Sequence, residues 1–336
     1  MSSVRIGISG WTYRPWRGTF YPEKWVQKRE LEYASRQVNS IEINGSFYSL
    51  QTPASYRSWY DQTPDDFVFS VKGGRYITHL RRLKAVEEPL ANFFASGVLR
   101  LGRKLGPILW QLPPMLPYDP DRLQRFFELL PRDTDDAAAL ARRHDSRVKG
   151  KTWTKTDQNR PLRHALEVRH PSYETPDFVE LLREHGIGLV VADTAGKWPL
   201  MEDVTADFVY LRLHGSEELY VSGYTEEALD AWAKKIRTWA AGGEPSGARR
   251  IARRSPKVAR RDIFAYFDND VKVRSPYDAM LLAHKLGMGS RPPPGPSPET
   301  IAEVARILST GSDSRWQIGR TSTKKRSASP RARRPA

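Results

Sequence analysis

The chain has 336 residues, no cysteine and a formal net charge of +15 at pH 7. The lack of cysteine excludes disulfides, thiolate metal sites and a cysteine nucleophile, and it agrees with a reducing compartment. No apolar stretch of the sequence approaches the roughly 20 residues of a membrane helix, and the start MSSVRIGISGW has no signal-peptide pattern, so we expect no membrane partner and a cytoplasmic location.

Eight short apolar segments, each ending in polar and mostly ionisable residues, predict the strands of a buried parallel sheet. In chain order they are VRIGISGW (4–11), SIEIN (40–44), FVFSVK (67–72), ILWQL (108–112), ALEVRH (165–170), GLVVAD (188–193), VYLRLHG (209–215) and IFAYFDND (263–270). Helical patterns separate most of them, at 22–37, 53–62, 83–105, 119–131, 175–186, 225–243 and 275–287. This alternation predicts an α/β fold, a single (β/α)8 barrel of the TIM type, over residues 1–290.

Prolines and one short connection mark the irregular parts of this alternation. Pro22 suits the first turn of the first helix, and Pro89 is expected to interrupt or kink the helix at 83–105. Only residues 195–207 connect the sixth and seventh strands, so we expect the helix there to be short or missing.

Two segments carry nearly all of the excess positive charge. Residues 246–261 and residues 309–336 each have a net charge of +7, which leaves about +1 for the rest of the chain. The first is a basic insertion before the last strand, where RRIARRSPKVARR could form a short helix on the barrel face opposite the strand C-termini. Residues 291–336 are predicted to be a Pro-rich linker, a short helix and a disordered basic tail. These arms could bind nucleic acid through counterion release, or they could be solvated extensions that keep the protein soluble.

The C-terminal ends of the strands are the expected location of a functional site, because in a TIM barrel they meet at one end, which we call the barrel mouth. The polar residues at these ends are Glu42, Lys72, Gln111, Glu167, Arg169, His170, Asp193, Arg212, His214, Asp268 and Asp270.

Several sequence blocks, taken in order, resemble those of a known family. They are WTYRPWRGTFYP (11–22), EINGSFY (42–48), TPDDFVFSVK (63–72), ITH (77–79), QLPP (111–114), RHALEVRHPSY (163–173), YLRLHG (210–215), YTEEALDAWA (224–233) and YFDND (266–270). They are similar to the signature blocks of the YecE-like family, domain of unknown function 72, over about residues 5–287. Tyr173 departs from the tryptophan or phenylalanine that is more usual there. The resemblance implies a TIM-type barrel without a settled activity. That barrel is similar to those of endonuclease IV and xylose isomerase, a likeness of fold that does not carry function.

Three cations at the barrel mouth point to an anionic ligand. Lys72, Arg169 and Arg212 follow three different strands, and arginine can bind phosphate or carboxylate through two hydrogen bonds. We therefore expect a small anionic substrate there. The alternative is that the two arginines only balance the charge of buried carboxylates. Further candidate substrate-binding residues are Gln111, Glu42, Asn44, Tyr48 and Trp11.

Candidate catalytic residues are chosen for their ability to exchange protons near neutral pH. His214 is the first candidate, with Glu167 or Asp193 as its partner and His170 as a further candidate. Side chains alternate along a strand, so Glu167 lies on the same face as Arg169, and His214 lies on the same face as Arg212.

A divalent metal is a second hypothesis for the same region. His79, His170, His214, Asp268 and Asp270 are the candidate ligands, because imidazole and carboxylate groups suit zinc, manganese or iron. The sequence lacks an HxH or HExxH spacing that would place two ligands on one element. The carboxylates could instead neutralise the cations of the barrel mouth.

These residues favour an enzyme that acts on a phosphate- or carboxylate-bearing substrate, such as a phosphodiester or nucleotide derivative, by acid–base chemistry with or without a metal. The alternatives are a nucleic-acid-binding protein that uses the basic arms, and a sugar or sugar-phosphate isomerase or lyase. The sequence lacks the GxSxG, Walker and GxGxxG motifs of serine hydrolases, NTPases and dinucleotide-binding proteins. A Schiff-base enzyme could use Lys72, although the sequence offers no reason for a lowered pKa of its amine.

Overall fold

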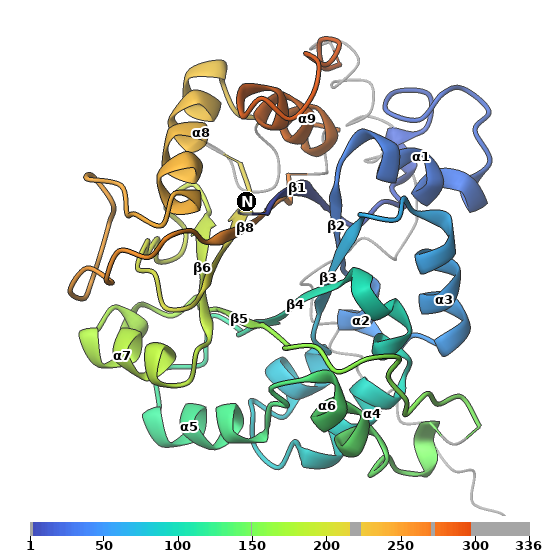
Figure 1. The fold of residues 1–336 in the computed structure, drawn as a ribbon, viewed down its shortest axis with the longest axis vertical. Helices are drawn as coiled ribbons and strands as arrows, with labels where there is room; N and C mark the ends of the chain where they lie inside the picture. Colours follow the sequence, from blue (N-terminus) through green and yellow to red (C-terminus); the bar gives the residue numbers. More distant parts are fainter. Residues whose placement is uncertain (1–2, 149, 216–222, 270–272, 297–336) are drawn as a thin grey trace, which may run out of the picture. The chain divides into compact units, whose positions relative to one another are not determined.

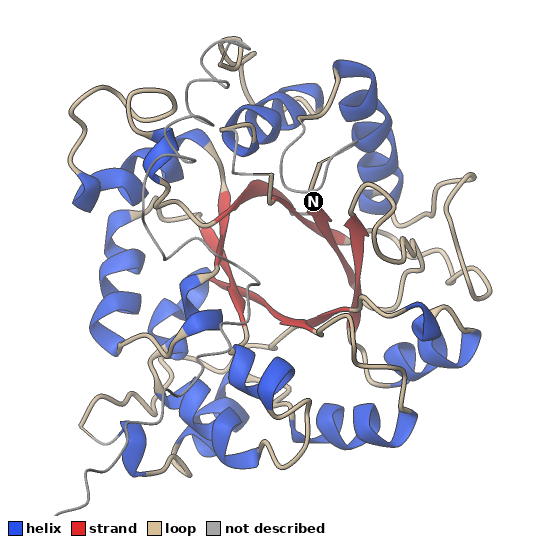
Figure 2. Cartoon of the chain, turned by 180° about the vertical axis from the view of Figure 1, so that it is seen from behind, coloured by secondary structure: helices blue, strands red, loops and turns tan. Residues whose placement is uncertain are grey.

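The barrel closes because each strand pairs in parallel with the next along the chain and the last strand pairs with the first. The strands are β1 (Val4–Ser9), β2 (Ser40–Ile43), β3 (Val68–Lys72), β4 (Leu105–Gln111), β5 (His164–Glu167), β6 (Gly188–Asp193), β7 (Phe208–Leu213) and β8 (Asp262–Phe267). The computed structural model describes residues 3–148, 150–215, 223–269 and 273–296. The predicted (β/α)8 barrel is confirmed, and helices surround the ring of strands in Figures 1 and 2.

The structure has nine α-helices among the described residues, and five of them begin after a residue whose side chain caps the first turn. The nine are α1 (Glu30–Gln37), α2 (Gly45–Tyr48), α3 (Pro53–Gln62), α4 (Glu87–Ala95), α5 (Pro120–Leu129), α6 (Thr134–Ala141), α7 (Pro176–Glu184), α8 (Glu226–Ala240) and α9 (Ser275–Lys285). The five capped helices are α3 and α5–α8. Short 3-10 helices cover Arg14–Trp16, Gln27–Arg29, Val98–Lys104, Ser146–Val148 and Pro171–Tyr173, and a π-helical turn covers Tyr76–Leu80. Side chains of Thr52, Asp119 and Thr175 accept the backbone N–H three residues on and precede a proline in the first turn.

Two helix predictions need correction. The first barrel helix begins at Glu30 rather than near Pro22, because aromatic side chains pack residues 11–25 as an irregular segment. Pro89 causes no break, since it lies in the first turn of α4, where proline costs no helical hydrogen bond. The break comes at Gly97, whose φ of 115° a helix does not allow. The connection at 194–207 has no helix, within the expectation of a short or missing one.

The basic insertion at 246–261 is not a helix, and the prediction of a short helix there is wrong. Three buried carboxylates accept backbone N–H groups of the insertion instead, and so hold it as an irregular loop. Glu202 accepts from Arg249, Asp203 accepts from two N–H groups slightly further along the loop, and Glu244 accepts from Ser255. The loop lies beside α7 and α8 in Figure 1.

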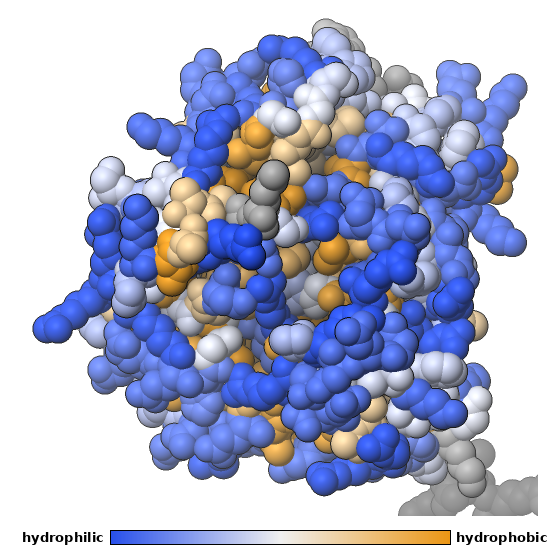
Figure 3. Space-filling view, in the orientation of Figure 1, coloured by the Kyte–Doolittle hydropathy of each residue, from blue (hydrophilic) through white to orange (hydrophobic). Residues whose placement is uncertain are grey.

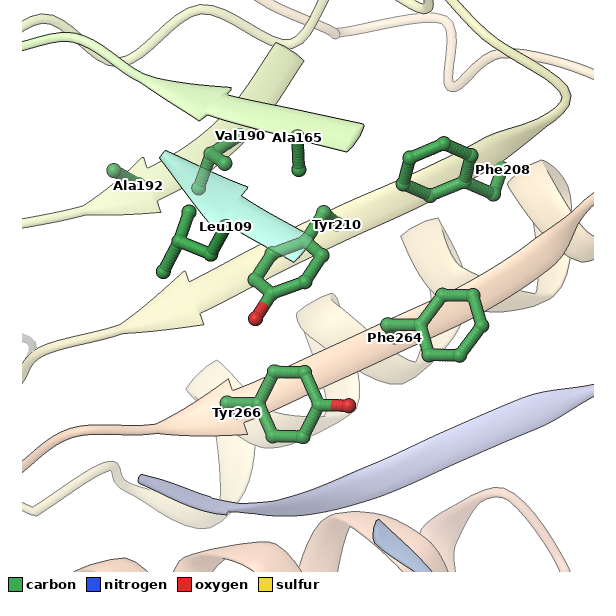
Figure 4. Close-up of a cluster of buried hydrophobic side chains, with 8 residues drawn as sticks. All are labelled: Leu109, Ala165, Val190, Ala192, Phe208, Tyr210, Phe264 and Tyr266. Atoms are coloured by element: carbon green, nitrogen blue, oxygen red, sulfur yellow. The ribbon is translucent and has the colours of Figure 1, made fainter. Parts of the chain in front are cut away.

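Apolar side chains fill the interior near the start of the strands. The cluster comes from β4 to β8 and consists of Leu109, Ala165, Val190, Ala192, Phe208, Tyr210, Phe264 and Tyr266 (Figure 4). Phe208 and Phe264 lie at one end of it, and the rings of Tyr210 and Tyr266 lie further along β7 and β8 with their centroids 5.3 Å apart.

The interior becomes polar toward the barrel mouth. The hydroxyl of Tyr266 lies 2.7 Å from Ser40 Oγ and 2.8 Å from Ser70 Oγ, and the hydroxyl of Tyr210 donates to Glu42 at 2.7 Å. These bonds satisfy polar groups that would otherwise be costly to bury. The barrel therefore has an apolar floor and a polar upper half.

Outside the barrel, the face in Figure 3 is mainly hydrophilic, with hydrophobic residues gathered near its middle. No helix among the described residues is long and apolar enough to cross a membrane. The predicted tail at 309–336 lies outside the described residues, as does most of the segment 291–336.

A close approach of β1 and β2 gives a test of this packing. A Cβ at Gly7 would lie 1.9 Å from the carbonyl oxygen of Ser40, so we expect Gly7→Ala to force the strands apart and cost about 1–3 kcal/mol of unfolding free energy. Gly247→Ala is the control, because its Cβ would meet no atom within 4 Å. Urea denaturation measures both, and equal midpoints for the two variants would contradict the prediction.

Candidate active site

Arg212 is the centre of the barrel mouth. Its side chain comes from β7, is completely buried, and binds three carboxylates from three other parts of the barrel. Nη2 donates to Glu42 at 2.9 Å and to Asp268 at 2.7 Å, while Nη1 donates to Glu167 at 2.8 Å. One guanidinium thus joins β2, β5 and the end of β8.

Neighbouring donors complete the hydrogen bonding of two of these carboxylates. Ser9 and Tyr210 donate to Glu42 at 3.0 and 2.7 Å. Gln111 and Arg169 donate to Glu167, each at 2.9 Å. The four carboxylate oxygens therefore all accept hydrogen bonds, as buried carboxylates require.

The electrostatics of this cluster favour its charged state. Burial alone would raise the pKa of Glu167, but Arg169 and Arg212 outweigh it and hold that pKa well below its usual range. Asp268 is similar: burial acts to raise its pKa, and Arg212 with His214 lowers it below the usual value. Burial would lower the pKa of Arg212, yet the three carboxylates raise it well above normal.

His214 is buried beside this cluster. Its Nδ1 lies 3.1 Å from Asp268 Oδ2, and its Nε2 lies 3.4 Å from Arg212 Nη1. Burial, followed by the charge of Arg212, lowers the pKa of His214. The neutral imidazole is therefore the favoured form near pH 7, and its full burial makes it a residue that positions Asp268.

Lys72 lies at the end of β3 with a different environment. It is 7% exposed, and its Nζ sits 4.5 Å from the centroid of the Phe47 ring. No hydrogen bond or ion pair joins Nζ to another residue in the described part of the chain. Burial, and secondly Arg212, lower the pKa of this amine to about 8.

Arg169 and His79 border the same region. The Arg169 guanidinium stacks 3.8 Å from the centroid of Trp198, and its side chain is 11% exposed. His79 packs edge-on against Phe47, and its Nδ1 is 2.9 Å from Thr78 Oγ1. Burial and the charge of Lys72 lower the pKa of His79 to about 4.

Asp193 belongs to a separate pair. Strand alternation places Val190 and Ala192 of β6 in the interior cluster, so Asp193 faces the other way. Its carboxylate accepts a hydrogen bond from Tyr224 at 3.0 Å, and burial raises its pKa.

The remaining candidates lie at the edge of the mouth. His170 faces its own turn, where Nδ1 accepts from the Ser172 backbone at 3.2 Å, and Tyr48 is 58% exposed. Trp11 packs on Trp59 and lines a depression of about 600 Å³ whose walls include no member of the Arg212 cluster. Asn44 follows β2, and its buried Oδ1 has no hydrogen-bond partner among the described residues.

The described residues do not form a metal site of the expected kind. Across residues 3–148, 150–215, 223–269 and 273–296, no three histidine, aspartate or glutamate side chains converge as metal ligands would. His214 and Asp268 meet, but Arg212 binds the same Asp268 oxygen that faces the imidazole. His79 and His170 each bond locally, and Asp270 lies outside the described residues.

Several residues of the site were not identified from the sequence. Tyr210 lies two residues before Arg212 on the same face of β7, so strand alternation could have indicated it. Ser9 is the polar last residue of β1, so its place at a strand end could have indicated it. Trp198 follows β6 in an irregular connection without such a signal. Asp278 resembles an ordinary first-turn residue of α9, although burial raises its pKa to about 6 and Asn269 donates to it at 2.8 Å.

Comparisons with known proteins relate the sequence to one family. Residues 5–301 match a family described as "Protein of unknown function DUF72". UPF0759 protein YecE of Escherichia coli K12 is 25% identical over 242 residues, which are 70% of this chain and 82% of YecE. UPF0759 protein YunF of Bacillus subtilis is 29% identical over 116 residues, 33% of this chain and 40% of YunF.

Solved structures share the fold. A DUF72 family protein from Thermotoga maritima superimposes with a TM-score of 0.64 at 22% identity, over 85% of this chain and 99% of that one. A second one, from Enterococcus faecalis, gives a TM-score of 0.62 at 14% identity, over 88% of this chain and all of that one. At these identities the likeness concerns the fold.

Removing the central guanidinium should be costly and depend on pH. We expect Arg212→Met to lose about 3–5 kcal/mol of unfolding free energy at pH 7, because three buried carboxylates lose their partner. Without the arginine, burial raises the pKa of Glu167 and Asp268, so their protonation lessens the destabilisation of the variant as the pH falls toward 5. In the wild type, Glu167 and Asp268 keep a lowered pKa, and their contribution is lost only below about pH 4.

Urea denaturation at pH 7 and pH 5 measures this difference. The control is Arg57→Met, which removes an exposed ion pair with Asp61 and should change stability by less than about 1 kcal/mol. A loss for Arg212→Met that is equal at both pH values would contradict the prediction.

Proposed function

The chain belongs to the DUF72 family, and from the geometry of its barrel mouth we propose that it is an enzyme that binds a small substrate bearing a phosphate or carboxylate group beside Lys72 and Arg169. The substrate would be transformed there by acid–base chemistry.

The observation that carries this proposal is that the cations of the barrel mouth differ in how far protein carboxylates already bind them. Arg212 is fully buried and directs its hydrogen bonds to protein carboxylates, so it organises the site without contacting a substrate. Lys72 and Arg169 are slightly exposed at the rim of this cluster, and the amine of Lys72 has no protein anion bound to it in the described residues. A ligand anion would supply the missing partner for a partly buried cation.

The ionisation states of nearby groups support acid–base chemistry. With a pKa of about 8, Lys72 can both donate and accept protons near physiological pH, as catalysis by a general acid or base requires. Asp193 also has a raised pKa, but it pairs with Tyr224 on the other face of β6 and has no role in this proposal. In this proposal Glu167 and His214 are positioning residues, since both are completely buried.

A second function is favoured by the loop at 246–261. Buried carboxylates hold its backbone, while Arg253, Lys257 and Arg260 remain exposed. We propose that these side chains bind the phosphates of a nucleic acid without sequence readout. The loop lies between α8 and β8, at the barrel end opposite the mouth, so this binding would be independent of catalysis.

Anion binding at the mouth can be measured directly. We expect inorganic phosphate, pyrophosphate or citrate to raise the melting temperature of the protein. Isothermal titration calorimetry should show that Lys72→Met lowers the affinity for that ligand at least tenfold. Lys72→Met should fold, because it replaces a partly desolvated cation with an apolar side chain of similar length. The control is the exposed Lys84→Met, which carries the same charge change. Equal binding by wild type and Lys72→Met, or no binding by the wild type, would refute the proposal.

Nucleic-acid binding can be tested on the full chain with an Arg253→Gln/Lys257→Gln/Arg260→Gln variant. Fluorescence anisotropy with a labelled oligonucleotide should show weaker binding, and the slope of its salt dependence should fall by about one unit for each phosphate that the variant no longer neutralises. The matched control, Arg142→Gln/Arg143→Gln/Lys234→Gln, removes three exposed charges elsewhere. If the two variants bind alike, the loop is not the binding surface.

A further inference from the structure

Two buried lysines of this protein have contrasting environments. Lys104, at the start of β4, is 1% exposed, and its Nζ donates to the Tyr60 carbonyl and to both the carbonyl and the hydroxyl of Thr63 at 2.7–3.1 Å. All three of its protons therefore have acceptors, which is how a structural ammonium group is stabilised. Lys72 is nearly as buried, yet its amine faces an aromatic ring instead.

Hydrogen bonds fix the backbone at Lys72, whereas its amine has no hydrogen-bond acceptor among the described residues. Ser46 Oγ donates to the Lys72 carbonyl at 2.6 Å, and the backbone N–H of Gly73 donates to the Leu109 carbonyl at 2.8 Å. Gly73 is required there, because a Cβ at this position would lie 2.2 Å from the Trp110 ring. The backbone at the end of β3 is thus fixed, and it presents the amine to the barrel mouth at the face of Phe47.

The nearby carboxylates already bind other donors, so they do not serve as hydrogen-bond acceptors for the Lys72 amine. Glu42 and Glu167 accept hydrogen bonds on both oxygens, and Asp268 accepts from Arg212. These acids still attract Lys72 through space, whereas burial and Arg212 disfavour its charged form. The charged and titratable groups around the amine are Glu42, Glu167, Asp268, Arg212 and His79.

A buried amine without hydrogen-bond acceptors, held at the substrate end of a barrel strand, is the arrangement of a nucleophile. Building on the anionic-substrate site proposed above, we propose that Lys72 forms a Schiff base with an aldehyde or ketone group of the substrate. Its substrates would then be small carbonyl compounds that also carry a phosphate or carboxylate.

The chemistry balances without an oxidant or reductant. The neutral amine donates its electron pair to the carbonyl carbon, and the carbonyl oxygen gains a proton to give a carbinolamine. That oxygen then leaves as water together with the second amine proton, so amine and carbonyl become imine and water. At pH 7 roughly a tenth of an amine with a pKa of about 8 is neutral, compared with roughly one in three thousand at the ordinary lysine value of 10.5.

A protonated imine withdraws electrons from the adjacent carbon atom, which eases loss of a proton or cleavage of a carbon–carbon bond there. The class of reaction is therefore that of a lyase or isomerase of an anionic carbonyl compound. Asn44, whose buried Oδ1 lacks a partner among the described residues, follows Glu42 by two positions and could accept a hydroxyl of such a substrate.

Trapping the imine tests this inference. The full-length protein is incubated with dihydroxyacetone phosphate, glyceraldehyde 3-phosphate or pyruvate, reduced with sodium cyanoborohydride, and digested for mass spectrometry. We expect an adduct on Lys72 that forms at least tenfold faster than on the exposed Lys84, with a rate that rises through a midpoint near pH 8. Lys104 should stay unmodified, because acceptors hold its protons.

Lys72→Arg separates this inference from the function on which it rests. Arginine keeps the positive charge but cannot form the imine, so we expect no adduct at this position, and circular dichroism would confirm that the variant is folded. Adducts spread over exposed lysines without preference for Lys72, in a protein whose phosphate binding still depends on Lys72, would overturn the Schiff base alone. If there is no preferential adduct on Lys72 and phosphate binding does not depend on Lys72 either, the anionic-substrate site is overturned as well.

Discussion

The burial of one guanidinium governs the upper half of this barrel. A completely buried arginine would be prohibitively costly alone, so Arg212 can exist only where Glu42, Glu167 and Asp268 converge on it. These partners come from β2, β5 and the end of β8, elements far apart in the sequence. The ion pairs therefore require the barrel to close in one register, and a slip of one residue would turn each group to the other face.

The same requirement gives the interior its polarity gradient. Phenylalanine, leucine and alanine side chains fill the floor, and hydroxyl groups from Ser40, Ser70 and the two tyrosines lead upward to the carboxylates. These hydrogen bonds satisfy the buried hydroxyl groups and the oxygens of Glu42 and Glu167, which allows charge to be buried at the mouth. Lys72 differs from its surroundings because it is left outside these bonds.

Buried carboxylates serve a second purpose at the opposite end of the barrel. Glu202, Asp203 and Glu244 bind backbone N–H groups of the loop at 246–261, so the acidic groups fix the main chain and leave several basic side chains in solvent. A segment that composition alone describes as a basic arm is in this way an ordered part of the barrel surface. The charge of the loop and its shape thus have separate origins.

The sequence by itself determined the barrel, because strand patterns of period two and helical patterns alternate along the chain, and it located the polar residues that gather at the strand ends. It could not decide which of them contact one another. Arg212 and Arg169 look alike as strand-end arginines, yet tertiary contacts bury the first among three carboxylates and stack the second on Trp198. Likewise, the sequence placed Lys72 at a strand end and Lys104 in a predicted helix, but it could not show which amine has hydrogen-bond acceptors. Only the packed structure supplies acceptors to one and an aromatic ring to the other, because burial and hydrogen bonding depend on residues that are distant in sequence.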